Sequence, residues 1–121
     1  MFDESKRRRA MRPEVRVSRQ ALAVVQPINR QIGQWQTATI RLMALGRKAR
    51  LTGRPTEALR RETLVLSALV KEHEAELRAR TRDLPPAVAN SGRIRDTRMA
   101  LDSVSRSLEA TLQTLAPLDE A

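Results

Sequence analysis

An aliphatic residue recurs every seven positions near the end of the chain. The residues at this interval are Ile94, Leu101, Leu108 and Leu115, with Val104 and Leu112 between them. An α-helix makes about 3.6 residues per turn, so residues seven apart share one face, and a repeat sustained over three heptads is typical of a coiled-coil or bundle seam. The pattern predicts a helix from Arg93 to Leu115 that must bury this stripe against other helices.

Apolar residues at helical spacing predict three helical segments before this one. They cover Pro13–Gln26, Pro27–Leu51 and Thr56–Asp83, and no sustained period-two alternation predicts a strand. The stripes expected to be buried are Val17, Ala21, Val24 and Ile28 in the first segment, Ile28, Ile32, Trp35, Thr39 and Leu42 in the second, and Leu59, Thr63, Leu66, Val70, His73 and Leu77 in the third.

Proline and glycine mark the boundaries between segments. Gly53 and Pro55 separate the second and third segments, because glycine adopts the left-handed cap conformation and proline cannot continue a helix, and Thr56 can then serve as an N-cap. Residues 84–92, which begin with Leu84-Pro85-Pro86, are predicted to be a loop. Pro27 interrupts without a turn sequence, so it either begins a new helix or kinks a continuous one.

These segments predict an all-α fold of one domain. Aromatic residues make up only 2% of the 121 residues, so the core must be aliphatic, as suits a helical bundle. We expect a three- or four-helix up-and-down bundle in which the last two segments form a long antiparallel hairpin. Residues 1–12 form a basic N-terminal arm, 13–116 the bundle and 117–121 an acidic tail.

Catalytic and metal-binding motifs are missing from the sequence. The chain has no cysteine, no glycine-rich phosphate loop and a single histidine, His73, which lies on a predicted core stripe. We therefore expect no enzyme activity, metal, cofactor or small-molecule substrate. The longest apolar run is Ala21–Val25, far short of the ~20 residues that cross a bilayer, so we expect no membrane partner and a location in the cytoplasm or within a virion.

The net charge of +9 indicates a polyanionic partner. Two basic clusters stand out. The first surrounds the turn between the second and third segments, with Glu57 and Glu62 as its nearby acids, and the second surrounds the loop after the third segment, with Glu76, Asp83 and Asp96. The first contains Arg41, Arg47, Lys48, Arg50, Arg54, Arg60 and Arg61, and the second Arg78, Arg80, Arg82, Arg93, Arg95 and Arg98.

The position of the N-terminal arm depends on Pro27. If Pro27 separates two antiparallel helices, the arm joins the first cluster, whereas a kinked single helix places the arm at the opposite end. Both layouts can follow a phosphate backbone without reading base sequence. The predicted nucleic-acid site combines the first cluster with the cations of the arm, which are Lys6, Arg7, Arg8, Arg9 and Arg12.

Four apolar residues fall outside the predicted core stripes. They are Ile40 and Met43 in the second segment and Leu64 and Val65 in the third. Apolar residues all round a helix indicate either a central position in the bundle or contact with another molecule. These four either complete a four-helix core or form an interface with protein subunits or with a second copy.

In size, helicity and basicity the chain resembles the small helical subunits of RNA-guided CRISPR effector complexes. The resemblance implies a non-catalytic subunit of a larger assembly that contacts the backbone of RNA or DNA without reading its sequence. An alternative is a phage or virion structural or adaptor protein. A second alternative is a helical chaperone that binds another protein's helix in an amphipathic groove.

Overall fold

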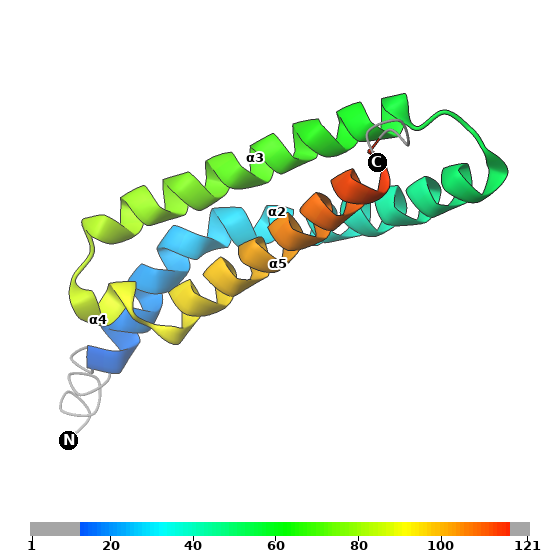
Figure 1. Ribbon diagram of the computed structural model, residues 1–121. Helices are drawn as coiled ribbons and strands as arrows, with labels where there is room; N and C mark the ends of the chain where they lie inside the picture. The colour runs from blue at the N-terminus through cyan, green and yellow to red at the C-terminus, as the bar shows by residue number, and fades with distance from the viewer. Residues whose placement is uncertain (1–12, 117–121) are drawn as a thin grey trace, which may run out of the picture.

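The computed structural model describes the backbone of residues 13–116 and the side chains of residues 15–116. These residues form three long helices, α2 (Pro13–Thr52), α3 (Glu57–Arg82) and α5 (Gly92–Thr114), together with the one-turn helix α4 (Pro86–Ala89) and no strand. The long helices lie side by side, with α3 antiparallel to both α2 and α5 (Figure 1). The predicted all-α up-and-down bundle is confirmed, with three long helices in the described part.

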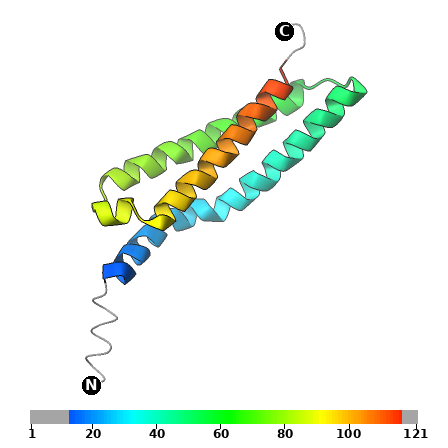
Figure 2. The same cartoon turned by 60° about the horizontal axis from the view of Figure 1, so that its bottom comes forward.

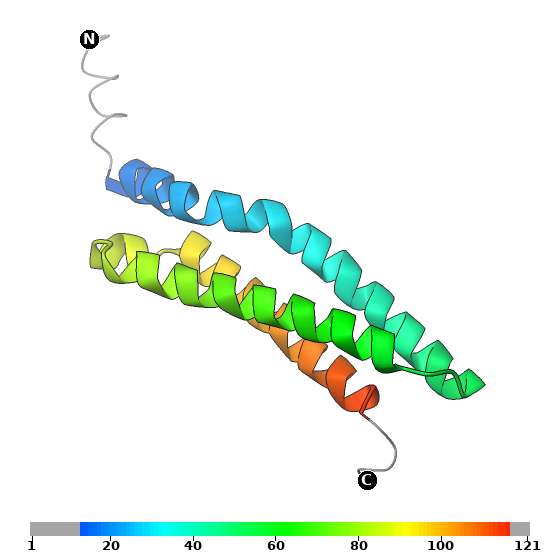
Figure 3. The same cartoon turned by 90° about the horizontal axis from the view of Figure 1, so that it is seen from above.

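Helix α2 continues through Pro27 as a single helix. Figure 3 shows that its ribbon bends along its length instead of reversing. A proline inside a helix leaves the carbonyl four residues earlier without a donor, here that of Ala23. Ala23 and Pro27 are both exposed, so that carbonyl can be hydrated. Of the two alternatives for Pro27, the continuous helix is the one found, and α2 begins at the end of the bundle opposite the α2–α3 turn.

Most residues of the predicted stripes form the core. In the first segment Ala21 and Ile28 are buried. Val17 and Val24 are half-buried, because the buried face runs through Val25 instead. Ile94, Leu101, Leu108 and Leu115 are each 0% exposed, and α2 contributes Ile28, Ile32, Trp35, Thr39 and Leu42, all buried. From α3, Thr63, Val70 and Leu77 are buried, while Leu59, Leu66 and His73 are half-buried at the edges. An aliphatic interior of three interlocked stripes therefore holds the helices at fixed register.

The α2–α3 turn has the geometry that its glycine predicts. Gly53 has a φ of 65°, which an L-residue with a side chain rarely adopts. The amide of Arg54 donates to the carbonyl of Ala49 at 2.8 Å, and the amide of Gly53 donates to that of Arg50 at 3.4 Å. This is a Schellman motif, which satisfies carbonyls at the end of α2 that lack helical partners.

The structure confirms the position of one predicted helix end and corrects one predicted loop. Thr56 stands at the N-cap position of α3 but makes no side-chain cap bond, because its hydroxyl donates to the carbonyl of Leu115 at 3.4 Å. The predicted loop 84–92 contains α4, which starts at Pro86, a position where a helix needs no amide donor. Val88 on α4 is 1% exposed and joins the core, so burial of this side chain stabilises the extra turn.

Candidate nucleic-acid interface

The two basic clusters lie at opposite ends of the bundle. We call the end that carries the α2–α3 turn and the C-terminus of α5 the distal end, and the end that carries the start of α2, α4 and the start of α5 the proximal end (Figure 2). The first cluster lies at the distal end and the second at the proximal end. Lys6, Arg7, Arg8, Arg9 and Arg12 lie outside the described residues, and the described chain begins at the proximal end.

Three cations of the distal cluster have partners within the chain. Arg41 forms an ion pair with Glu62 across α2 and α3. Arg61 pairs with Glu57 one turn earlier, at 2.9 Å. Arg50 donates from Nε to the carbonyl of Thr114 at 2.6 Å and from Nη2 to that of Ala116. These guanidinium groups already make bonds that a phosphate would have to replace.

The other four distal cations have no described carboxylate within ion-pair distance. Arg47, Lys48 and Arg54 are exposed and Arg60 is half-buried. They come from the last turns of α2, the turn itself and the first turns of α3. This end of the bundle therefore presents unneutralised positive charge from two helices and their connection.

The proximal cluster is of similar composition. Arg80 pairs with Glu76 at 2.7 Å, and Arg93 donates from Nε to the hydroxyl of Ser18 on α2 at 2.9 Å. The remaining four have no ion pair among the described residues and are exposed. They are Arg78 and Arg82 on α3 and Arg95 and Arg98 on α5.

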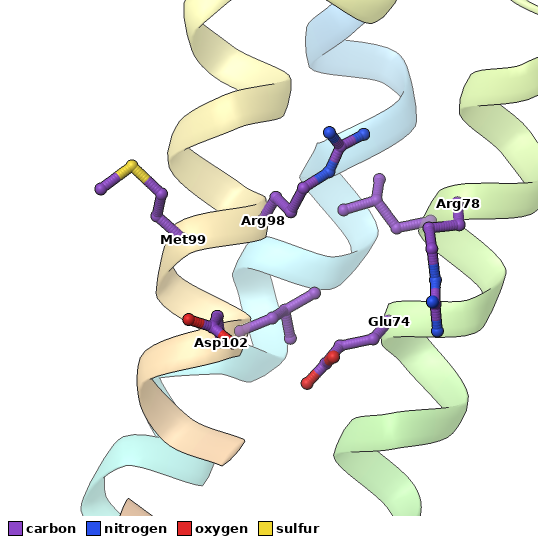
Figure 4. Close-up of a pocket in the computed structure, with 7 residues that line it drawn as sticks. Glu74, Arg78, Arg98, Met99 and Asp102 are labelled. Atoms are coloured by element: carbon purple, nitrogen blue, oxygen red, sulfur yellow. The ribbon is translucent and has the colours of Figure 1, made fainter. Parts of the chain in front are cut away.

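A cleft of about 480 Å³ opens between α3 and α5 beside the proximal cluster. Its floor is Leu77 and Leu101, and its walls carry Arg78 and Arg98 together with Glu74, Met99 and Asp102 (Figure 4). The sequence gives no direct sign of this cleft, since its walls come from helices that only the fold brings together. The i, i+4 pair of Glu74 and Arg78 is the local signal of a mixed-charge face.

The four apolar residues predicted to form a core or an interface do not complete a core. Ile40 is 68% exposed, Val65 70% and Leu64 49%. Met43 is half-buried and lines a small pocket of about 130 Å³ between α2 and α5. Leu64 and Val65 are adjacent in α3 and therefore point about 100° apart.

His73 contributes to packing. Its ring meets Trp35 edge to face, with centroids 4.8 Å apart, and its Nδ1 lies 2.9 Å from the carbonyl of Leu69. Residues 15–116 contain no group of three His, Asp or Glu side chains arranged to hold a metal ion. Nor is any described helix long and apolar enough to cross a bilayer.

Comparison with known protein families, with curated proteins and with solved structures finds no match to this chain.

Proposed function

We propose that this chain is a non-catalytic helical subunit of a larger assembly that binds the phosphate backbone of a nucleic acid. The observation that supports the proposal is the gathering of arginine and lysine side chains without carboxylate partners at both ends of the described bundle. Such cations gain free energy by releasing counterions condensed on a polyphosphate, whatever its base sequence.

Arginine suits this role better than lysine does. Its planar guanidinium can pair with a phosphate through two parallel hydrogen bonds and remains charged at every physiological pH. Of the four distal cations without an ion pair among the described residues only Lys48 is a lysine, and the corresponding four proximal cations are all arginines. All of these cations except Arg54 lie on helices, which hold their backbone positions at fixed spacing before a ligand binds.

The test is binding of a fluorescently labelled random oligonucleotide at several salt concentrations. We expect the affinity to fall steeply as salt rises. Replacing Arg47 and Lys48 with glutamate should weaken binding and lower the salt slope by about 2. Replacing Arg30 and Lys71, which lie in the middle of α2 and α3, makes the same change in net charge away from both ends and serves as the control.

Arg50 and Arg61 are left unchanged in this test because each makes contacts within the fold. Absence of binding by the wild-type chain at low salt would refute the proposal. Equal weakening by the two double variants would show instead that only net charge matters and that the distal cluster is not a site.

The assembly to which the subunit belongs has two candidate forms. Ile40 and Val65 are exposed apolar side chains that contact with a neighbouring subunit would bury. An RNA-guided effector complex is the first form and a virion or phage structure is the second. Light scattering separates them in part, because self-association of the purified chain into rings or rods favours the second form.

A further inference from the structure

The cleft between α3 and α5 carries a rim of arginines. Arg78 and Arg98 line it from opposite helices. Arg82 follows Arg78 by one turn and Arg95 precedes Arg98 by one turn, so each shares a helix face with its neighbour. None of the four has a carboxylate partner among the described residues. The proximal mouth of the cleft is therefore positively charged on both sides.

The floor of the cleft is apolar. Leu77 is 1% exposed and Leu101 is 0% exposed, so they close the bottom of the cleft. Met99 is 64% exposed and points away from Glu74 and Arg78 on the outer side of α5 (Figure 4). Methionine is flexible and polarisable and makes favourable contacts with aromatic rings. Leu77 and Leu101 offer a base almost no exposed surface, so the contacts of a base in the cleft are made with its polar walls and with the edge that Met99 contributes.

The two carboxylates of the cleft differ in their partners. Asp102 forms an ion pair with Arg106 at 2.9 Å. Glu74 forms no ion pair with a described residue, and its Oε1 is buried without accepting a hydrogen bond from any of them. A buried acceptor without a donor is unfavourable. Because the terminal torsion of a glutamate is soft, this carboxylate can turn to accept bonds from N–H groups of a ligand in the cleft.

We propose that the cleft binds one nucleotide of a single-stranded nucleic acid, with its phosphate between Arg78 and Arg98 and an amino-bearing base against Glu74. This inference rests on the proposed function and assigns it a second site, separate from the distal cluster. The volume of about 480 Å³ falls within the range of small-molecule sites, roughly 300–1,000 Å³. An unpaired strand is required, because a base within a duplex cannot enter the cleft.

The carboxylate of Glu74 selects among bases by the direction of their hydrogen bonds. Cytosine presents an amino group at position 4, which donates to a carboxylate. Uracil has the same shape but carries a carbonyl oxygen there, which a carboxylate repels, so uracil can offer this carboxylate only its single N3–H. The cleft therefore adds a preference at one nucleotide to a contact with the backbone that is otherwise independent of sequence.

The experiment compares labelled oligo(C) and oligo(U) of about 12 nucleotides by fluorescence anisotropy. We expect the wild-type chain to bind oligo(C) about tenfold more tightly. Glu74→Gln should bring this ratio close to one, because an amide both donates and accepts, while the arginines still hold the phosphate. Arg78→Ala with Arg98→Ala should weaken binding to both oligonucleotides.

The matched control for the arginine pair is Arg80→Ala with Arg93→Ala. These residues lie on the same two helices at the same end and carry the same charge, but they do not line the cleft. Their removal should affect affinity much less. The cleft site would be overturned if the wild-type chain bound both oligonucleotides equally and the two arginine double variants lost the same amount of affinity. The proposed function would then still stand. No binding to any oligonucleotide would refute both.

Oxidation of methionine by peroxide gives a second measurement that uses only the wild-type chain. Met99 lines the cleft, so oligo(C) should slow its conversion to the sulfoxide, as followed by mass spectrometry. Met43 lines a different pocket, between α2 and α5, and should be oxidised at an unchanged rate. If oligo(C) binds but Met99 is not protected, the nucleotide does not occupy the cleft and this proposal is overturned.

Discussion

Replacing Arg50 with methionine should destabilise the bundle although the side chain lies at its surface. Arg50 at the end of α2 donates two hydrogen bonds to carbonyls at the end of α5, those of Thr114 and Ala116. Thr56 donates to the carbonyl between them, that of Leu115. The end of α5 is thus capped by residues from α2 and from the start of α3. Methionine keeps the apolar stem and removes only the donors and the charge.

The expected loss is about 2 kcal/mol. The last carbonyls of a helix have no helical donor, and a hydrogen bond from a charged group contributes about 1.5–3 kcal/mol. Arg50 is half-buried, so the lower value applies to each bond, and freeing the side chain returns about 0.5–1 kcal/mol of conformational entropy. In a domain of about this size, the melting temperature should fall by roughly 8 °C.

Thermal and urea unfolding followed by circular dichroism measure this effect. Arg47→Met is the control, because Arg47 is exposed and has no described ion-pair partner, and it should change stability by less than about 0.5 kcal/mol. Arg50→Lys keeps the charge beside the helix end but lacks the guanidinium fork, so about half of the loss should remain. Equal midpoints for Arg50→Met and Arg47→Met would refute the role assigned to this cap.

Two further pairs of variants test the packing. A Cβ on Gly46 would lie 3.0 Å from Cδ2 of Leu115, whereas a Cβ on Gly33 would meet nothing within 4 Å. Gly33→Ala should therefore raise the free energy of unfolding by about 0.5–1 kcal/mol, and Gly46→Ala should lower it by about 1 kcal/mol. Equal shifts of the urea midpoint in the two variants would contradict the close packing of Gly46 against Leu115. Leu101→Ala should lower the free energy of unfolding by about 3 kcal/mol, since Leu101 is fully buried. Met99→Ala should change it by less than about 0.5 kcal/mol. An equally small effect of Leu101→Ala would show that Leu101 is not part of the core.

Periodicity alone was enough to predict most of the core. The heptad series from Ile94 to Leu115 is completely buried. Side chains at that spacing lie on one face of the helix, and this face is buried against the other helices. Gly53 likewise marked the end of α2, since its positive φ has few alternatives. These are features that a residue and its near neighbours decide.

Features that depend on distant residues escaped prediction. Pro27 can lie within a continuous helix only if packing on both sides of it outweighs the one hydrogen bond that it removes. Here this packing is present, because the stripe from Ala21 to Ile32 is buried without interruption. Burial of Val88 against the core stabilises α4. The contacts of Arg50 with the end of α5 span more than sixty residues of sequence. No local pattern contains such information.

The cleft escaped prediction for the same reason. Arg78 and Arg98 belong to different helices, and their sequence context shows only that each is a cation near a carboxylate. The antiparallel register of α3 and α5 sets them on facing walls. The exposure of Val65 could not be predicted either, because it depends on how many helices surround α3.

The unbroken course of α2 fixes a distance. A helix of 40 residues measures about 60 Å at 1.5 Å per residue, which is close to the length of 18 base pairs at 3.4 Å each. If the chain binds nucleic acid as proposed, a fragment much shorter than this can contact one end of the bundle only, so two such fragments can bind at once. A longer strand can contact both ends together.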